Sequence, residues 1–188
     1  MRRLYLALLL LCGVGGLVAM QEHAKELTDQ ERIALTEKAK ELITKATKLY
    51  ETGRHQEATT LLEDALKIQQ TLYPTAQFLN GHTAVADNLH QLAVVSWGQR
   101  KFAAAEGYYR QAIAMRQKLY SADKYPQGHA DLAMSMNNLG YVLEEQGKYA
   151  DAEKWYLEER VSHRRDSLPF QLVFLFLLLA FQREEERY

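Results

Sequence analysis

Few residues of this chain have the types and spacing that a chemical site requires. Asp87 and His90 lie three positions apart in a helical pattern, so both side chains would leave one face and could bind a metal ion. No further His or Cys ligand accompanies them, and a surface hydrogen bond is the favoured interpretation. The sequence has no nucleophile paired with a base, no phosphate-binding glycine loop and no carboxylate dyad. We therefore predict no enzyme activity, no cofactor and no metal site.

The charge of the chain is balanced, which limits the classes of partner. Its 23 Lys and Arg residues nearly equal its 24 Asp and Glu residues. A nucleic-acid-binding chain usually carries a basic excess, so no nucleic-acid partner is expected. Three prolines and the lack of alternating strand-type residues favour a helical chain.

The N-terminal segment is typical of an export signal. The basic Met1-Arg2-Arg3 precedes the apolar run from Leu4 to Leu11, and small residues follow at 13–19. We expect residues 1–19 to be a signal peptide, which would place the mature chain outside the cytoplasm, either secreted or periplasmic. An uncleaved N-terminal anchor is the alternative. Cys12, the single cysteine, lies inside this segment, so no disulfide is expected in the mature domain.

The strongest signal in the sequence is an internal repeat with a period of 47 residues. A shift by that distance carries Gly81-His82 onto Gly128-His129 and Leu72-Tyr73 onto Leu119-Tyr120. The register does not slip, and the matching positions are apolar, small or turn-forming. Such regularity is typical of stacked structural units. Further matches join Ala58 to Ala105 and Ala152, Leu92 to Leu139, Val95 to Val142, Glu106 to Glu153 and Tyr109 to Tyr156.

Each unit has the pattern of two amphipathic helices joined by a short turn. In the third unit, apolar residues recur at three- and four-residue spacing from Leu132 to Leu143, which is one helical stripe. Gly147 then suits a helix end, because glycine adopts the left-handed conformation at little cost. A second helix begins at Tyr149. We expect units at about 36–73, 83–120 and 130–159.

These motifs resemble the tetratricopeptide repeat (TPR). In the third unit, the residues that match the TPR motif are Leu139-Gly140, Leu143, Gly147, Tyr149, Ala152-Glu153 and Tyr156. The long repeat and the link Tyr125-Pro126-Gln127-Gly128-His129 are similar to kinesin light chains and bacterial multi-repeat proteins. The resemblance implies an all-α fold, an α-solenoid of antiparallel helix pairs with about three TPR-like units over residues 28–159.

Three further expectations follow for the structural residues of the array. Small side chains at Ala58, Ala105 and Ala152 would let paired helices approach closely. Lys45 stands where Leu92 and Leu139 stand later, which suits a terminal unit with a solvated outer face. The periodic His82 and His129 favour a structural role in the linking turn.

The resemblance also implies a concave groove, lined by the first helix of each unit, that binds a peptide or protein. Tyr50, Trp97 and Tyr141 offer large contact areas of the kind enriched at binding hot spots, although Trp97 and Tyr141 could instead cover neighbouring helices. Lys40 alone is no clamp for a carboxylate, so no preference for acidic C-terminal tails is expected. The expected groove residues are Lys40, Ile43, Thr47, Tyr50, Asp87, His90, Val94, Trp97, Met134, Asn137, Tyr141 and Glu144.

The repeat pattern stops after Glu159, and residues 160–188 form a divergent tail with an expected apolar helix at 168–182. This helix could cover the open end of the array, contact a membrane, or have no selected function. Membrane contact is also conceivable through residues 1–20. The run is short for a membrane span, which takes about 20 apolar residues.

Three functions remain open at this point. The leading hypothesis is an exported, non-catalytic scaffold that binds a peptide or protein in its concave groove. A truncated regulatory fragment of a larger repeat-containing enzyme, such as a peptidase-type effector, is the second. A membrane-attached adaptor is the third.

Overall fold

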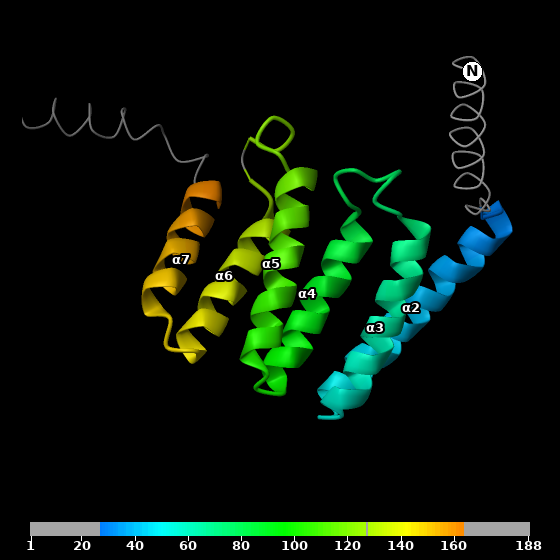
Figure 1. Cartoon of the computed structure of the whole chain (residues 1–188), viewed down its shortest axis with the longest axis horizontal. Helices are drawn as coiled ribbons and strands as arrows, with labels where there is room; N and C mark the ends of the chain where they lie inside the picture. The colour runs from blue at the N-terminus through cyan, green and yellow to red at the C-terminus, as the bar shows by residue number, and fades with distance from the viewer. Residues whose placement is uncertain (1–26, 127, 164–188) are drawn as a thin grey trace, which may run out of the picture. The chain divides into compact units, whose positions relative to one another are not determined.

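The computed structural model of the chain describes residues 27–126 and 128–163 (Figure 1). The regular structure of this part of the chain is entirely helical, with no strand, which confirms the all-α prediction. The expected signal segment 1–19 and the expected helix 168–182 lie outside the described residues. The helices are α2 (Asp29–Glu51), α3 (His55–Leu72), α4 (Thr83–Gly98), α5 (Phe102–Leu119), α6 (Ala130–Glu145) and α7 (Tyr149–His163).

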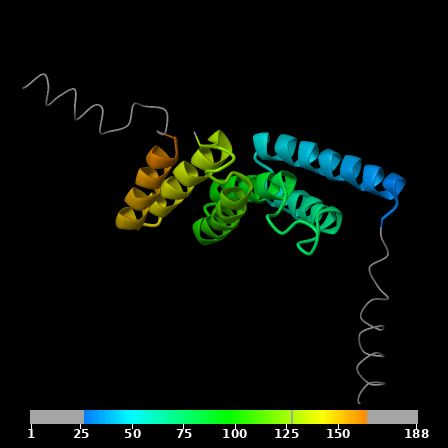
Figure 2. The same ribbon diagram turned by 90° about the horizontal axis from the view of Figure 1, so that it is seen from above.

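The helices form successive antiparallel pairs. The contacts divide the chain after Ala34, and the packing described below is that of the second unit, from Leu35 onward. In this unit α4 packs on α5, α6 packs on α7, and the pairs are joined by contacts of α3 with α4 and of α5 with α6. Both views show α6 and α7 side by side (Figures 1 and 2). None of the described helices is long and apolar enough to cross a bilayer.

Small residues stand where the helices approach most closely. Ala58, Ala105 and Ala152 are all buried, as the repeat pattern predicted. Because a larger side chain would push the helix axes apart, these positions set the spacing within each unit. The interior is built from leucine, valine and tyrosine side chains of adjacent pairs, so each pair completes its core on its neighbour.

The links between units use the periodic histidines. The imidazole of His82 stacks on Tyr73 with 3.5 Å between ring centroids, and His129 stacks on Tyr120 at 3.6 Å. Each histidine also caps a helix: Nδ1 of His82 accepts from the amide of Ala84 in α4, and His129 does the same for α6. A side-chain acceptor at this position satisfies an otherwise unpaired amide. The predicted structural role of His82 and His129 is therefore confirmed.

The turns inside the units require a left-handed residue. Gly53 and Gly147 adopt φ of 77° and 74°, as the pattern at Gly147 predicted. Arg100 takes the same place in the middle unit with φ of 58°. A residue with a Cβ pays a conformational cost in this region, which glycine does not.

Replacing Arg100 by glycine is expected to stabilise the array. The change removes the conformational cost of a side chain in the left-handed region. This gain exceeds the energy lost with the contact between the Arg100 guanidinium and the Phe102 ring, which lie 5.4 Å apart. We expect the free energy of unfolding in urea to rise by about 0.5–1 kcal/mol. The matched change Gly147→Ala meets open space around the new Cβ, so it should lower the same quantity by ~1 kcal/mol through backbone strain alone. A fall in the unfolding free energy for Arg100→Gly together with a rise for Gly147→Ala would show that these turns are not left-handed.

Candidate functional site

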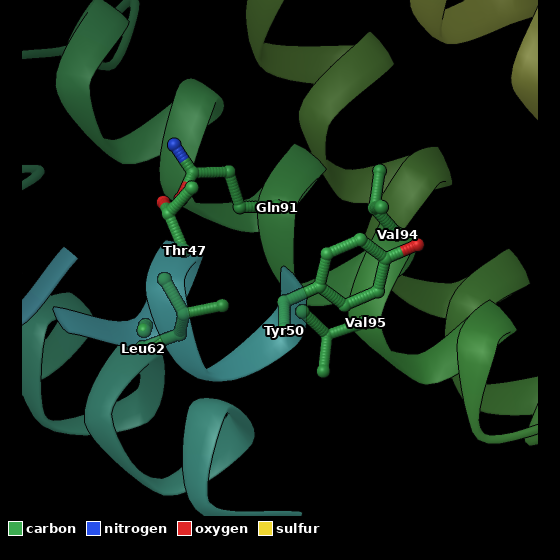
Figure 3. Close-up of a pocket in the computed structure, with 7 residues that line it drawn as sticks. Thr47, Tyr50, Leu62, Gln91, Val94 and Val95 are labelled. Atoms are coloured by element: carbon green, nitrogen blue, oxygen red, sulfur yellow. The ribbon is translucent and has the colours of Figure 1, made fainter. Parts of the chain in front are cut away.

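Two adjoining pockets lie along the first helices of the units, and both are lined by Val94. The first encloses about 280 Å³ between α2, α3 and α4 (Figure 3). The second encloses about 220 Å³ and is bounded by α4, α5 and α6. The first is lined by Ala46, Thr47, Tyr50, Leu62, Gln91, Val94 and Val95. The second is lined by Val94, Trp97, Tyr109, Asn138, Tyr141 and Val142.

Five of the expected groove residues line these pockets. Thr47 and Tyr50 contribute to the first, Trp97 and Tyr141 to the second, and Val94 to both. Ile43 packs half-buried against the core of the first units. Five other expected groove residues are exposed and lie outside both linings: Lys40, Asp87, Met134, Asn137 and Glu144.

His90 does not lie in the groove. Its side chain is 9% exposed, and Nδ1 is 3.0 Å from the hydroxyl of Ser135. The expected surface hydrogen bond for the Asp87 and His90 pair is therefore wrong, because the imidazole faces the interior between units. Within residues 27–126 and 128–163, no cluster of three His, Cys, Asp or Glu side chains could hold a metal ion.

Two amides in the linings were missed by sequence reasoning. Gln91 lies in the first pocket and Asn138 in the second, and they occupy equivalent positions of successive units. The period of the repeat was the signal that could have found them. The remaining lining residues are apolar positions of the core, which a sequence cannot distinguish from fully covered ones.

Trp97 and Tyr141 both cover a neighbouring helix and border the second pocket. Their rings meet edge to face with centroids 5.8 Å apart, and Trp97 packs against the core while Tyr141 stays 49% exposed. Below them, burial raises the pKa of Tyr109 to about 12, although a hydrogen bond with Asn138 opposes the shift. The phenol is thus neutral at physiological pH. The second pocket offers aromatic rings and one amide rather than charge.

Comparison with known proteins agrees with this geometry. The family model described as "Tetratricopeptide repeat" matches residues 46–76, 85–130 and 132–158, which together make up more than half of the chain. The chain belongs to the tetratricopeptide repeat family.

One solved relative supports the long-repeat type. The crystal structure of BtubC (BKLC) from P. vanneervenii, a kinesin-light-chain-like TPR protein, matches with a TM-score of 0.56 and 27% identity. The match covers 79% of this chain and 51% of that chain, so this chain spans about half the length of BtubC. A search of curated proteins finds no match.

The TPR units are also joined by a buried polar pair at each interface. Asn88 of α4 donates to Oε1 of Gln69 in α3 at 2.9 Å. One period later, Arg116 of α5 donates to the hydroxyl of Ser135 in α6. Arg116 donates in addition to the carboxylate of Asp87 at 2.7 Å. Both interfaces thus use the same two positions, with an arginine replacing glutamine in the second.

The interface around Arg116 holds His90 in its neutral form. Burial and the guanidinium of Arg116 lower the pKa of His90 from 6.5 to about 4, against the opposing pull of Asp87 and Asp131. A lowered pKa in the folded state means that protonation favours the unfolded state. The stability contributed by neutral His90 is therefore present above pH 6.5 and is lost as the pH falls through 4.

We expect this loss to be measurable by comparison with His90→Gln, which cannot titrate. Between pH 7 and pH 4, the wild-type chain should lose roughly 2–3 kcal/mol more unfolding free energy than the variant. Urea titrations at half-unit pH steps would measure the difference. The two proteins differ only at position 90, so the comparison isolates the contribution of His90. Parallel pH profiles for both proteins would contradict the buried, neutral state of His90.

Proposed function

We propose that this TPR protein is a non-catalytic scaffold that binds a peptide or protein partner in the two pockets joined at Val94. The observation that carries the proposal is the lining itself: aromatic walls, an apolar floor and one amide in each pocket. Ligand sites combine these features because apolar contact supplies affinity and a few polar groups fix orientation.

The amides suit a peptide main chain. Gln91 and Asn138 each offer both a donor and an acceptor, which is what a peptide group presents in return. Their equivalence in the repeat places one amide in each pocket, so an extended segment running across the units could bond at both. Tyr50 and Tyr141 would then enclose apolar side chains of that segment, with little loss of rotamer entropy.

Charge has a small part in this recognition. No Lys or Arg lines either pocket. Lys40, the one basic residue of the expected groove, pairs with Glu37 at 2.8 Å. A free C-terminal carboxylate of the partner therefore has no cationic clamp in these pockets, and uncharged, apolar segments are the favoured ligands.

Substitutions in the pockets are expected to weaken peptide binding. Peptides would be selected from a random display library on the folded chain lacking residues 1–19. For a selected peptide, Tyr141→Ala should raise Kd about 30-fold, which corresponds to the ~2 kcal/mol lost on truncating a binding hot spot. Val94→Arg should abolish measurable binding because it inserts a charge into both pockets. Amidation of the peptide C-terminus should leave Kd unchanged.

Met134→Ala is the matched control for this experiment. Met134 is exposed on the same helix as Tyr141 but lies outside both linings, so its truncation should not affect Kd. Circular dichroism would confirm that each variant remains helical. Equal Kd values for wild type, Tyr141→Ala and Val94→Arg would rule out the pockets as the binding site.

We also propose that the scaffold is exported. The support is the basic and apolar pattern of residues 1–19, followed by small residues at the expected cleavage point. Intact mass measurement of the chain expressed in a bacterial host, recovered from the periplasm or medium, should show loss of about 19 residues. Recovery at full mass in the cytoplasm would contradict export, and full mass in the membrane fraction would indicate an anchor instead.

A further inference from the structure

One stripe of residues on α5 contacts the next unit of the array. Glu106 accepts hydrogen bonds from Gln146 at 3.0 Å and from Lys148 at 2.8 Å, both in the turn between α6 and α7. The guanidinium of Arg110 lies 5.7 Å from the ring centre of Trp155 in α7. This stripe thus combines apolar packing with a carboxylate that anchors the following turn.

The same stripe recurs on α7, where the described residues leave much of it exposed. Tyr149, Glu153 and Leu157 are spaced at i, i+4 and i+8, which places them along one side of the helix. Tyr149 is 70% exposed and Leu157 is 52% exposed. Phe102, the equivalent of Tyr149 in the middle unit, packs half-buried against the core.

The first unit of a second copy is a poor occupant for this face. The position that would meet it carries a lysine: Lys45 stands where Leu92 and Leu139 stand in later units, and it is exposed and paired with Glu41 at 2.6 Å. The predicted solvated outer face of the first unit is therefore present at this position. Burying this ion pair against Tyr149 and Leu157 would cost desolvation energy.

Residues 164–188 directly follow α7, and their sequence is complementary to the stripe. An apolar run spans residues 172–181, and the first cation after it is Arg183. We propose that residues 168–182 form an antiparallel helix that covers the Tyr149 and Leu157 stripe and places Arg183 beside Glu153.

The lengths are compatible with this arrangement. Residues 164–167 can span about 13 Å, and packed helices need 8–10 Å between axes. A helix from 168 to 182 would extend about 22 Å, the same as α7 with its 15 residues. Gln182 would then lie level with Tyr149, and Arg183 within side-chain reach of Glu153. The arrangement repeats the anchor of Lys148 on Glu106, with the cation supplied by the tail.

Disulfide trapping in the full chain tests this proposal. In a Cys12→Ser background, Tyr149→Cys and Gln182→Cys are introduced together and oxidised with copper phenanthroline at low protein concentration. We expect a cross-linked monomer in non-reducing electrophoresis. The control pair uses Lys154→Cys with Gln182→Cys, since Lys154 is exposed on another side of α7, and it should cross-link at least tenfold more slowly.

The other outcomes overturn the proposal in distinguishable ways. A cross-linked dimer would mean that the tail of a second copy covers the face. Equal rates for both pairs, or no cross-link at all, would mean that the tail does not dock there, as a membrane-inserted tail would not. None of these outcomes affects the two pockets, whose linings come from α2 to α6.

Charge reversal tests the ion pair separately. Glu153→Arg should slow trapping of the Tyr149→Cys and Gln182→Cys pair several-fold, and adding Arg183→Glu should restore most of the rate. Lys154→Glu serves as the control because its charge change lies on α7 but off the stripe. Failure of the double reversal to restore the rate would contradict the placement of Arg183 beside Glu153.

Discussion

The structure depends on one constraint: a single helix pair cannot bury its apolar face by itself. Each pair in this chain therefore completes its core on the next, and the close approach that this requires is possible because Ala58, Ala105 and Ala152 have small side chains. Gly140 shows how tight the approach becomes, since an added Cβ would clash with the ring of Tyr156.

Polar contacts hold these apolar interfaces in register. Gln69 with Asn88, and Arg116 with Ser135, occupy the same pair of repeated positions in the interior. At the turns, Gln99 donates to the hydroxyl of Thr59 at 2.7 Å, and the later turn is anchored on Glu106. Apolar packing is non-directional, whereas a buried hydrogen bond is lost on any slip, so these contacts select one stacking arrangement.

The pockets are a consequence of this stacking. The first helices of successive units pack on second helices, which leaves part of their other side uncovered around Val94. The lining is then supplied by the same helical positions in each unit, with Gln91 and Asn138 as the polar groups. A binding surface built in this way can change its specificity by substitutions at lining positions without altering the core.

The sequence by itself determined the architecture, because a 47-residue period with apolar stripes, small residues and glycine turns admits few folds. It also located Tyr50, Trp97 and Tyr141 on the correct helices. Only the tertiary structure decided that His90 is buried and that Gln91 and Asn138 line pockets. The physical reason is that a helical stripe specifies direction within one unit, while burial depends on the side chains that a neighbouring unit brings, such as Arg116 and Ser135.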